Sequence, residues 1–176
     1  MTVIGERKSF AIEFVLNEGD ALGGQWLYGH LRFWASNKTF GNYDSGTSLS
    51  VGIAKFKGLL KYSGRRTDPE LMCLPAETLL DRVMAALFID SGQSDAQVAA
   101  DAERYWPFVV APTGYDVFDD WRAVLVEDES KARFVWRHAD DPEEAVSEAR
   151  LLPGEFDRVA RKFVLEAESI GRAAGA

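Results

Sequence analysis

The 176 residues, of which 47% are hydrophobic and 12% aromatic, suffice to bury a full core, so we expect one globular domain over residues 1–176. A net charge of −8 at pH 7 excludes the basic footprint that neutralises phosphates, so we expect no nucleic acid partner. No run approaches the roughly 20 apolar residues of a membrane span and the first residues contain no apolar signal-peptide core, so we expect a cytoplasmic protein with no membrane partner.

Two strands joined as an antiparallel hairpin are predicted near the start of the chain. The first covers residues 10–16, and its apolar face consists of Phe10, Ile12, Phe14 and Leu16. The second covers residues 26–35, with Leu27, Gly29, Leu31, Phe33 and Ala35 on the core side and Trp26, Tyr28, His30, Arg32 and Trp34 on the other. The short connection between them is rich in Gly, as a hairpin requires. Glu13 is expected to meet His30 or Arg32 across the pair, as a structural contact.

Helices are predicted in the middle of the chain, after a turn at residues 36–38 and a short strand at 39–43. The first begins at Thr47 as N-cap and runs to about Tyr62. We interpret the basic cluster at this helix as a solvated helix face. The cluster consists of Lys55, Lys57, Lys61, Arg65 and Arg66. Apolar spacing predicts a second helix up to Phe88, and a weaker pattern predicts a third over residues 95–104. The single cysteine, Cys73, is expected to be a small buried hydrophobe.

The period returns to two in the last third of the chain. A short strand is expected at residues 108–111, followed by a loop at 113–120 and a hairpin with strands at 121–126 and 132–137. A last strand at 145–152 precedes Pro153, which opens a C-terminal helix that Gly171 ends. These elements predict an α+β fold, a mainly antiparallel sheet of two hairpin regions packed against three to four helices.

One segment comes close to an enzymatic motif. Residues 41–48 have the glycine spacing of a phosphate-binding P-loop between a strand and a helix, with Ser48 where a hydroxyl would bind magnesium. Thr47 stands where the motif needs lysine, and Asp44 adds a negative charge where anions should bind. A glycine-permitted turn and a capped helix start explain the same residues. A nucleotide-binding or other small-molecule enzyme that uses this turn, with the aromatic face of Trp26, Tyr28 and Trp34, remains the alternative hypothesis.

Other catalytic or metal-binding patterns are weaker. The two histidines, His30 and His138, lack the spacing to Cys, Asp or Glu that a metal site requires, so we expect no metal and no cofactor. The GxSxG motif of serine hydrolases is absent from the sequence. The clustered carboxylates have the pattern of solvated loops, whereas an acid catalyst needs one carboxyl in an apolar site. We therefore expect a protein that is not an enzyme.

The charge is unevenly distributed along the chain. Residues 1–66 contain 9 basic and 5 acidic residues, whereas residues 116–148 contain 4 basic and 11 acidic residues. The N-terminal part therefore carries +4 and the later hairpin region −7. An acidic surface of this kind allows a basic protein partner.

Four segments carry a resemblance to a known family: FAIEF, QWLYGHLRFW followed by GNYDSGTSL, FDDWRAVLVED, and LPGEFDRV. In this order they resemble the Imm42 family of immunity proteins from bacterial polymorphic toxin systems. The resemblance implies a cytoplasmic, non-catalytic protein that binds and neutralises a cognate toxin domain in the producing cell.

A basic toxin would be captured fastest by acidic loops, and these are the predicted contacts. The candidate partner-binding residues are Asp116, Asp119, Asp120, Glu127, Asp128, Glu129, Asp140, Asp141, Glu143 and Glu144. A third hypothesis is a scaffold protein whose exposed aromatic side chains mediate self-association.

Overall fold

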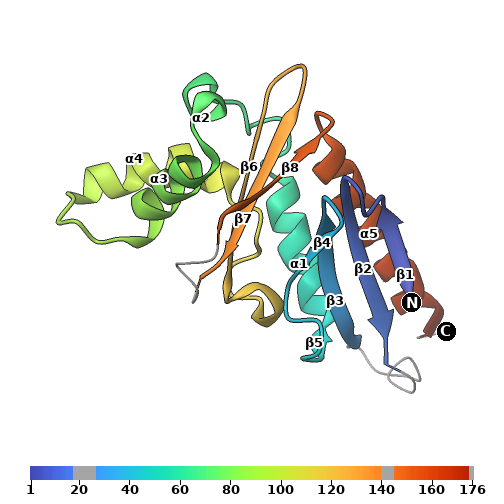
Figure 1. The fold of residues 1–176 in the computed structure, drawn as a ribbon. Helices are drawn as coiled ribbons and strands as arrows, with labels where there is room; N and C mark the ends of the chain where they lie inside the picture. Colours follow the sequence, from blue (N-terminus) through green and yellow to red (C-terminus); the bar gives the residue numbers. More distant parts are fainter. Residues whose placement is uncertain (18–26, 140–144, 175–176) are drawn as a thin grey trace.

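The computed structural model describes residues 1–17, 27–139 and 145–174, and the elements below lie within these ranges (Figure 1). The strands are β1 (Thr2–Gly5), β2 (Phe10–Leu16), β3 (Tyr28–Ala35), β4 (Lys38–Phe40), β5 (Thr47–Ser48), β6 (Trp121–Glu127), β7 (Ala132–His138) and β8 (Ser147–Leu151). The α-helices are α1 (Leu49–Leu60), α2 (Pro69–Cys73), α3 (Ala76–Phe88), α4 (Asp95–Tyr105) and α5 (Glu155–Ala174), with short 3-10 turns η1 (Trp106–Phe108) and η2 (Asp116–Phe118). The predicted α+β class is confirmed.

The first sheet has the strand order β1-β2-β3-β4, with β5 paired to β3, and every pairing is antiparallel. The predicted hairpin is confirmed, because β2 pairs with β3 from Phe10 opposite Ala35 to Leu16 opposite Gly29. Glu13 lies opposite Arg32 in this register. The edge strand β1 escaped prediction because it is four residues long and buries only Ile4.

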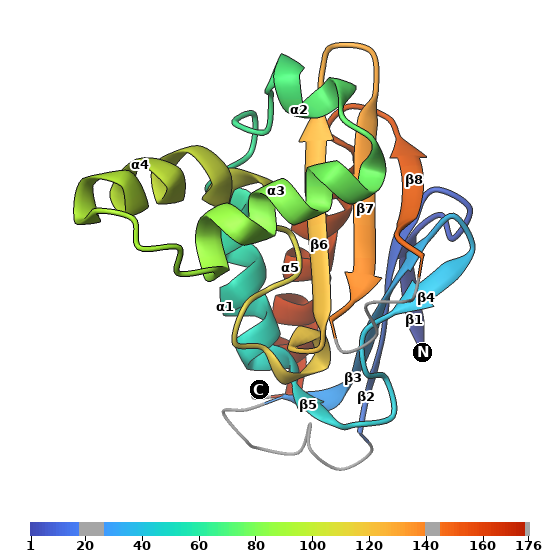
Figure 2. The same ribbon diagram turned by 60° about the vertical axis from the view of Figure 1, so that its left-hand side comes forward.

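The two hairpin regions form separate sheets. Strands β6, β7 and β8 make a second antiparallel sheet of three strands, and β6 pairs with β7 from Trp121 opposite His138 to Glu127 opposite Ala132. Helix α3 lies across the outer face of this sheet, and α1 and α5 lie on the other side (Figure 2). The second sheet is therefore an inner layer, covered on both faces.

The main core forms where the inner faces of the two sheets meet helices α1 and α5. Leu31 and Phe33 are fully buried, so the predicted core side of β3 is confirmed. Phe33 contacts the rings of Phe10, Phe40 and Phe118 at centroid distances of 5.3, 4.9 and 4.4 Å. A second apolar cluster, which includes Leu80, Val124 and Val135, fills the space between the outer face of the second sheet and helices α2 and α3.

Helix boundaries differ from the prediction where capping decides them. Ser48 and not Thr47 is the N-cap of α1, because its side chain accepts a hydrogen bond from the Val51 amide at 3.3 Å. Ser94 caps α4 in the same way, so the weakly predicted third helix exists. The predicted strand at 108–111 is instead a 3-10 turn followed by a single bridge between Val109 and Val124. Gly171 does not end α5, which continues to Ala174.

Two side chains lie where the sequence did not place them. Arg66, assigned to a solvated basic face, is fully buried and forms an ion pair with Asp157, Nη1 to Oδ1, at 2.7 Å. Cys73, expected to be buried, is exposed at the end of α2. The five-residue helix α2 buries Leu71 and Met72, and this leaves the next position outside.

Two glycines in α1 provide a test of the packing beneath this helix. A Cβ atom added to Gly52 would lie 2.7 Å from the hydroxyl oxygen of the buried Tyr115, whereas one added to Gly58 meets nothing within 4 Å. Alanine is favoured over glycine in helices by about 1 kcal/mol, so Gly58→Ala should raise the free energy of unfolding. Gly52→Ala should lower it by about 0.5–2 kcal/mol, because overpacking exceeds that gain. Urea denaturation of both variants checks this, and equal stabilisation by both would contradict the packing.

Candidate partner-binding surface

The predicted acidic residues are divided between the two ends of the β6–β7 hairpin. Asp116, Asp119 and Asp120 precede β6, and the acidic segment 127–129 follows at its far end. Strand β6, which is seven residues long and ends at Glu127, holds the two groups roughly 20 Å apart. Asp140, Asp141, Glu143 and Glu144 lie outside the described residues. Within the described residues the acidic candidates therefore do not form one continuous surface.

Two of the acidic residues at the β6–β7 turn stabilise the fold. Glu127 is buried, and its Oε2 accepts a hydrogen bond from the amide of Gly154 at 2.9 Å. The Asp128 carboxylate accepts hydrogen bonds from the Ser130 hydroxyl and amide and from the Lys131 amide. The Ser130 hydroxyl bond is the main cause of a lowered pKa at Asp128. Glu129 is exposed and keeps no hydrogen bond or ion pair within the described ranges.

The other end of the hairpin presents two free carboxylates. Asp116 is engaged, because its Oδ1 accepts hydrogen bonds from the Thr47 hydroxyl at 2.7 Å and from the Val117 amide at 3.0 Å. Asp119 and Asp120 are exposed, and neither side chain has a partner among the described residues. A bound partner can therefore reach and neutralise both charges without breaking an existing contact.

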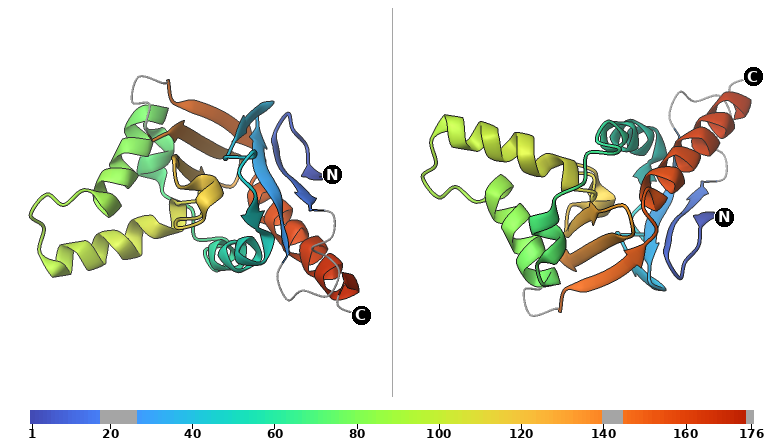
Figure 3. Two further views of the ribbon diagram at one scale, coloured as in Figure 1. Left: turned by 90° about the horizontal axis from the view of Figure 1, so that it is seen from below. Right: turned by 90° about the horizontal axis from the view of Figure 1, so that it is seen from above.

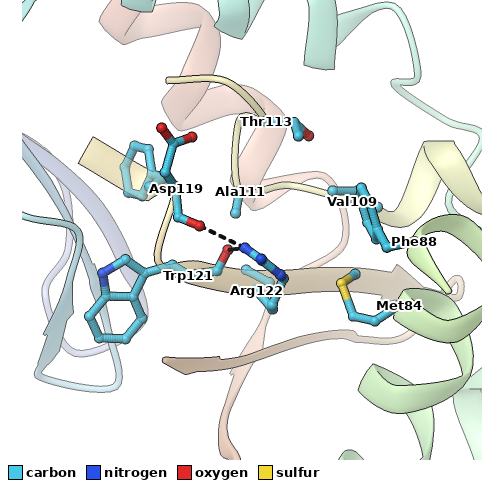
Figure 4. Close-up of a pocket in the computed structure, with 10 residues that line it drawn as sticks. Met84, Phe88, Val109, Ala111, Thr113, Asp119, Trp121 and Arg122 are labelled. Carbon is cyan, nitrogen blue, oxygen red and sulfur yellow. Dashed lines mark hydrogen bonds between the residues drawn. The ribbon is translucent and has the colours of Figure 1, made fainter. Parts of the chain in front are cut away.

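An apolar groove with a volume of about 290 Å³ lies directly beside Asp119. Met84 and Phe88 from α3 form one end, and Asp119 and Trp121 form the other (Figure 4). Arg122 lies between them, and its Nη1 donates hydrogen bonds to the backbone oxygens of Asp119 at 2.7 Å and Trp121 at 3.1 Å. We call this feature the α3 groove.

The end of α3 and the start of α4 meet at a tip that projects away from both sheets (Figure 3). This tip carries exposed apolar side chains. Phe88 is 47% exposed, Ile89 60% and Val98 51%. Sequence periodicity places Phe88 with the core residues Leu80 and Val83, but the last turn of α3 extends past β6, so nothing of the sheet covers it (Figure 2). Exposed apolar groups gathered beside a groove mark interaction sites.

The outer face of the first sheet is covered by its own side chains. The fully buried Glu13 carboxylate accepts hydrogen bonds from Arg32 Nη2 at 2.6 Å, Arg7 Nη2 at 2.7 Å and Trp34 Nε1 at 2.8 Å. Both guanidinium groups stack on Trp34, at 4.4 Å for Arg7 and 5.0 Å for Arg32. Burial raises the pKa of Glu13, but the hydrogen bonds from Arg32 and Trp34 and the nearby positive charges outweigh it, so the pKa is lowered. Each charge here has a partner within the layer, which makes the expected contact of Glu13 with Arg32 structural.

The aromatic face assigned to the alternative enzyme is divided by this layer. Trp34 belongs to it, Tyr28 is 46% exposed, and Trp26 lies outside the described residues. The residues of the P-loop-like turn also have structural roles. Thr47 is buried and its hydroxyl donates a hydrogen bond to Asp116, and Ser48 caps α1. The Asp116 carboxylate thus occupies the neighbourhood that a phosphate would need.

The histidines are engaged in local contacts. His30 Nδ1 lies 2.7 Å from the Tyr43 carbonyl oxygen, and His138 packs edge-on against Trp121. In the part of the chain that the structure describes, three or more His, Cys, Asp or Glu side chains nowhere gather closely enough to hold a metal ion. No helix within that part is both long and apolar enough to cross a membrane.

The chain matches one family model and resembles one solved structure. The family model described as Immunity protein 42 matches residues 1–166. The crystal structure of CdiI from Burkholderia dolosa AUO158 superimposes with a TM-score of 0.71 and 18% sequence identity, covering 94% of this chain and 99% of that chain. At this identity the similarity shows a shared fold. Comparison with curated proteins gives no match.

Proposed function

The chain belongs to the immunity protein 42 family, and from this premise we propose that it binds and neutralises a cognate bacterial toxin domain without catalysing a reaction. The observation that carries the proposal is the family match over residues 1–166. It agrees with the resemblance of the four sequence segments. It also agrees with the hydrogen bonds that Thr47 donates to Asp116 and that Glu13 accepts from Arg32, which give these two residues structural roles. The proposed site of action is the cytoplasm of the producing cell.

The proposed contact surface is the end of the hairpin that carries Asp119 and Asp120. Their carboxylates are exposed and unpaired within the described residues, so they can attract a basic toxin domain over a distance. Asp140, Asp141, Glu143 and Glu144 follow β7 in sequence and remain proposed contacts on the same grounds of charge. Glu127, Asp128 and Asp116 hold the fold together, and we leave them out of the surface.

Co-expression tests the proposal. The open reading frame beside this gene should be toxic when expressed alone, and co-expression of this protein should restore growth. The two proteins should also co-purify as a complex. A harmless neighbour, or a toxic one that this protein neither binds nor counteracts, would refute the proposal.

The proposed steering predicts a salt-dependent association rate. Asp119→Asn combined with Asp120→Asn should lower the rate of association with the toxin at least about threefold at 0.01 M salt, where the Debye length is about 30 Å. The difference should shrink at 0.15 M, where that length is about 8 Å. Dissociation should change less, because exposed rim charges act mainly on encounter.

The matched control removes two acidic charges elsewhere. Glu6→Gln combined with Glu166→Gln alters the β1–β2 turn and α5, and both side chains are exposed. Surface plasmon resonance at the two salt concentrations separates local from general effects. Equal association rates for the two double variants would show that the position of the charges does not matter, which is the result expected if they only confer solubility.

A further inference from the structure

We propose that the α3 groove receives one large apolar, preferably aromatic, side chain of the toxin, while a lysine or arginine beside that side chain pairs with Asp119 and Asp120. This inference rests on the proposed function and adds to it the part of the surface that holds the complex together. Charge accounts for encounter, whereas a slowly dissociating complex needs a buried anchor.

The size of the groove is sufficient for one large side chain of a protein partner. Its volume of about 290 Å³ is at the lower end of what small-molecule pockets offer, which is about 300–1,000 Å³. The buried side chains of Val109, Ala111, Phe118 and Ala123 contribute to its lining. A pocket of this size and apolar character fits one anchoring side chain of a protein partner.

Charge determines which group enters the groove and which stays at the rim. Arg122 lines the groove, and backbone oxygens rather than a carboxylate hold its guanidinium. Its charge would repel a cation inside the groove but attract the face of an aromatic ring. Lys55 adds a second positive charge nearby, because its Nζ donates to the Thr113 carbonyl oxygen at 2.6 Å. Asp119 lines the end of the groove and the exposed Asp120 follows it in the chain, so a cation flanking the anchor would meet their negative charges.

The exposed end of α3 completes the apolar surface. Phe88 forms one end of the groove and is held edge-on against Trp106, with ring centroids 5.5 Å apart. Ile89 follows it at 60% exposure. Aromatic side chains that are already packed on one side lose little conformational entropy on binding, which suits them to be contact hot spots.

Two substitutions in the groove test the inference against the neighbouring toxin domain. Phe88→Ala removes one end of the groove, and Thr113→Trp fills it from an exposed lining position. The control is Leu165→Ala, which removes an equally prominent apolar group, 63% exposed, from α5. Surface plasmon resonance gives the dissociation rates, and thermal unfolding verifies that each variant is folded.

We expect both groove variants to dissociate at least tenfold faster than the wild type, and Leu165→Ala to stay within twofold of it. Folded groove variants that dissociate within twofold of the wild type would overturn the groove as the anchor site while leaving the proposed function intact. If only Phe88→Ala accelerates dissociation, the exposed end of α3 makes the contact and the groove receives nothing. Absence of wild-type binding would instead refute the proposed function, and this inference with it.

Discussion

Replacing Asp157 with leucine is expected to lower the free energy of unfolding by about 3–5 kcal/mol, because it leaves the guanidinium of Arg66 buried without a counter-charge. Arg66 is fully buried, and its Nη1 lies 2.7 Å from Asp157 Oδ1. Its Nη2 donates to the Leu59 carbonyl oxygen at 2.8 Å, but its Nε has no hydrogen-bond partner. The carboxylate of Asp157 is therefore the only negative group that the described residues offer this charge.

A double-mutant cycle separates the ion pair from the space it fills. Arg66→Met removes the buried charge and keeps a long apolar side chain in contact with Phe156, whose ring lies 5.5 Å from the guanidinium carbon. The double variant Arg66→Met with Asp157→Leu should recover most of the stability lost in Asp157→Leu, because neither buried charge remains. Urea denaturation measures all four proteins. A loss below about 1 kcal/mol in Asp157→Leu would show that water reaches Arg66.

Arg66 also shows why part of the fold could not be read from the sequence. It follows Gly64 at the end of a basic run, and its partner is 91 positions away along the chain. A local sequence pattern cannot predict that a charged residue is buried when the segment that buries it is distant in the chain. The strand pair β2–β3 is the opposite case, since alternation within each strand and a short connection set the register from Phe10 opposite Ala35 onward.

Part of the candidate surface could be predicted from the sequence and part could not. The two exposed aspartates, Asp119 and Asp120, could be predicted, because they are adjacent in a loop just before a predicted strand. The α3 groove could not be predicted, because it brings together the end of α3, the segment around Val109 and the start of β6. Phe88 carried a misleading signal, since its helical periodicity is that of a core residue although 47% of it is exposed.

Replacing Phe33 with alanine should lower the free energy of unfolding by about 3–5 kcal/mol, the range for a buried aromatic side chain whose space cannot collapse. Phe33 is fully buried, and the rings around it belong to β2, β4, α1, α5 and η2. Because these elements come from all parts of the chain, no single neighbour can move to fill the cavity. Tyr28→Ala, in the same strand but 46% exposed, is the control and should change stability by less than about 1 kcal/mol. Equal losses in urea denaturation would mean that the faces of β3 are assigned the wrong way round.

The same substitution should also reach the proposed toxin contact. The ring of Phe33 lies 4.4 Å, centroid to centroid, from that of Phe118, and Phe118 is part of the lining of the α3 groove next to Asp119. A cavity beneath Phe118 removes the support of the η2 turn, so Phe33→Ala should speed toxin dissociation although no partner touches it. Tyr28→Ala should leave dissociation unchanged. If Phe33→Ala dissociates at the wild-type rate while losing stability, the groove does not depend on the core beneath Phe118, and its shape is set by Arg122 and the backbone oxygens that hold it.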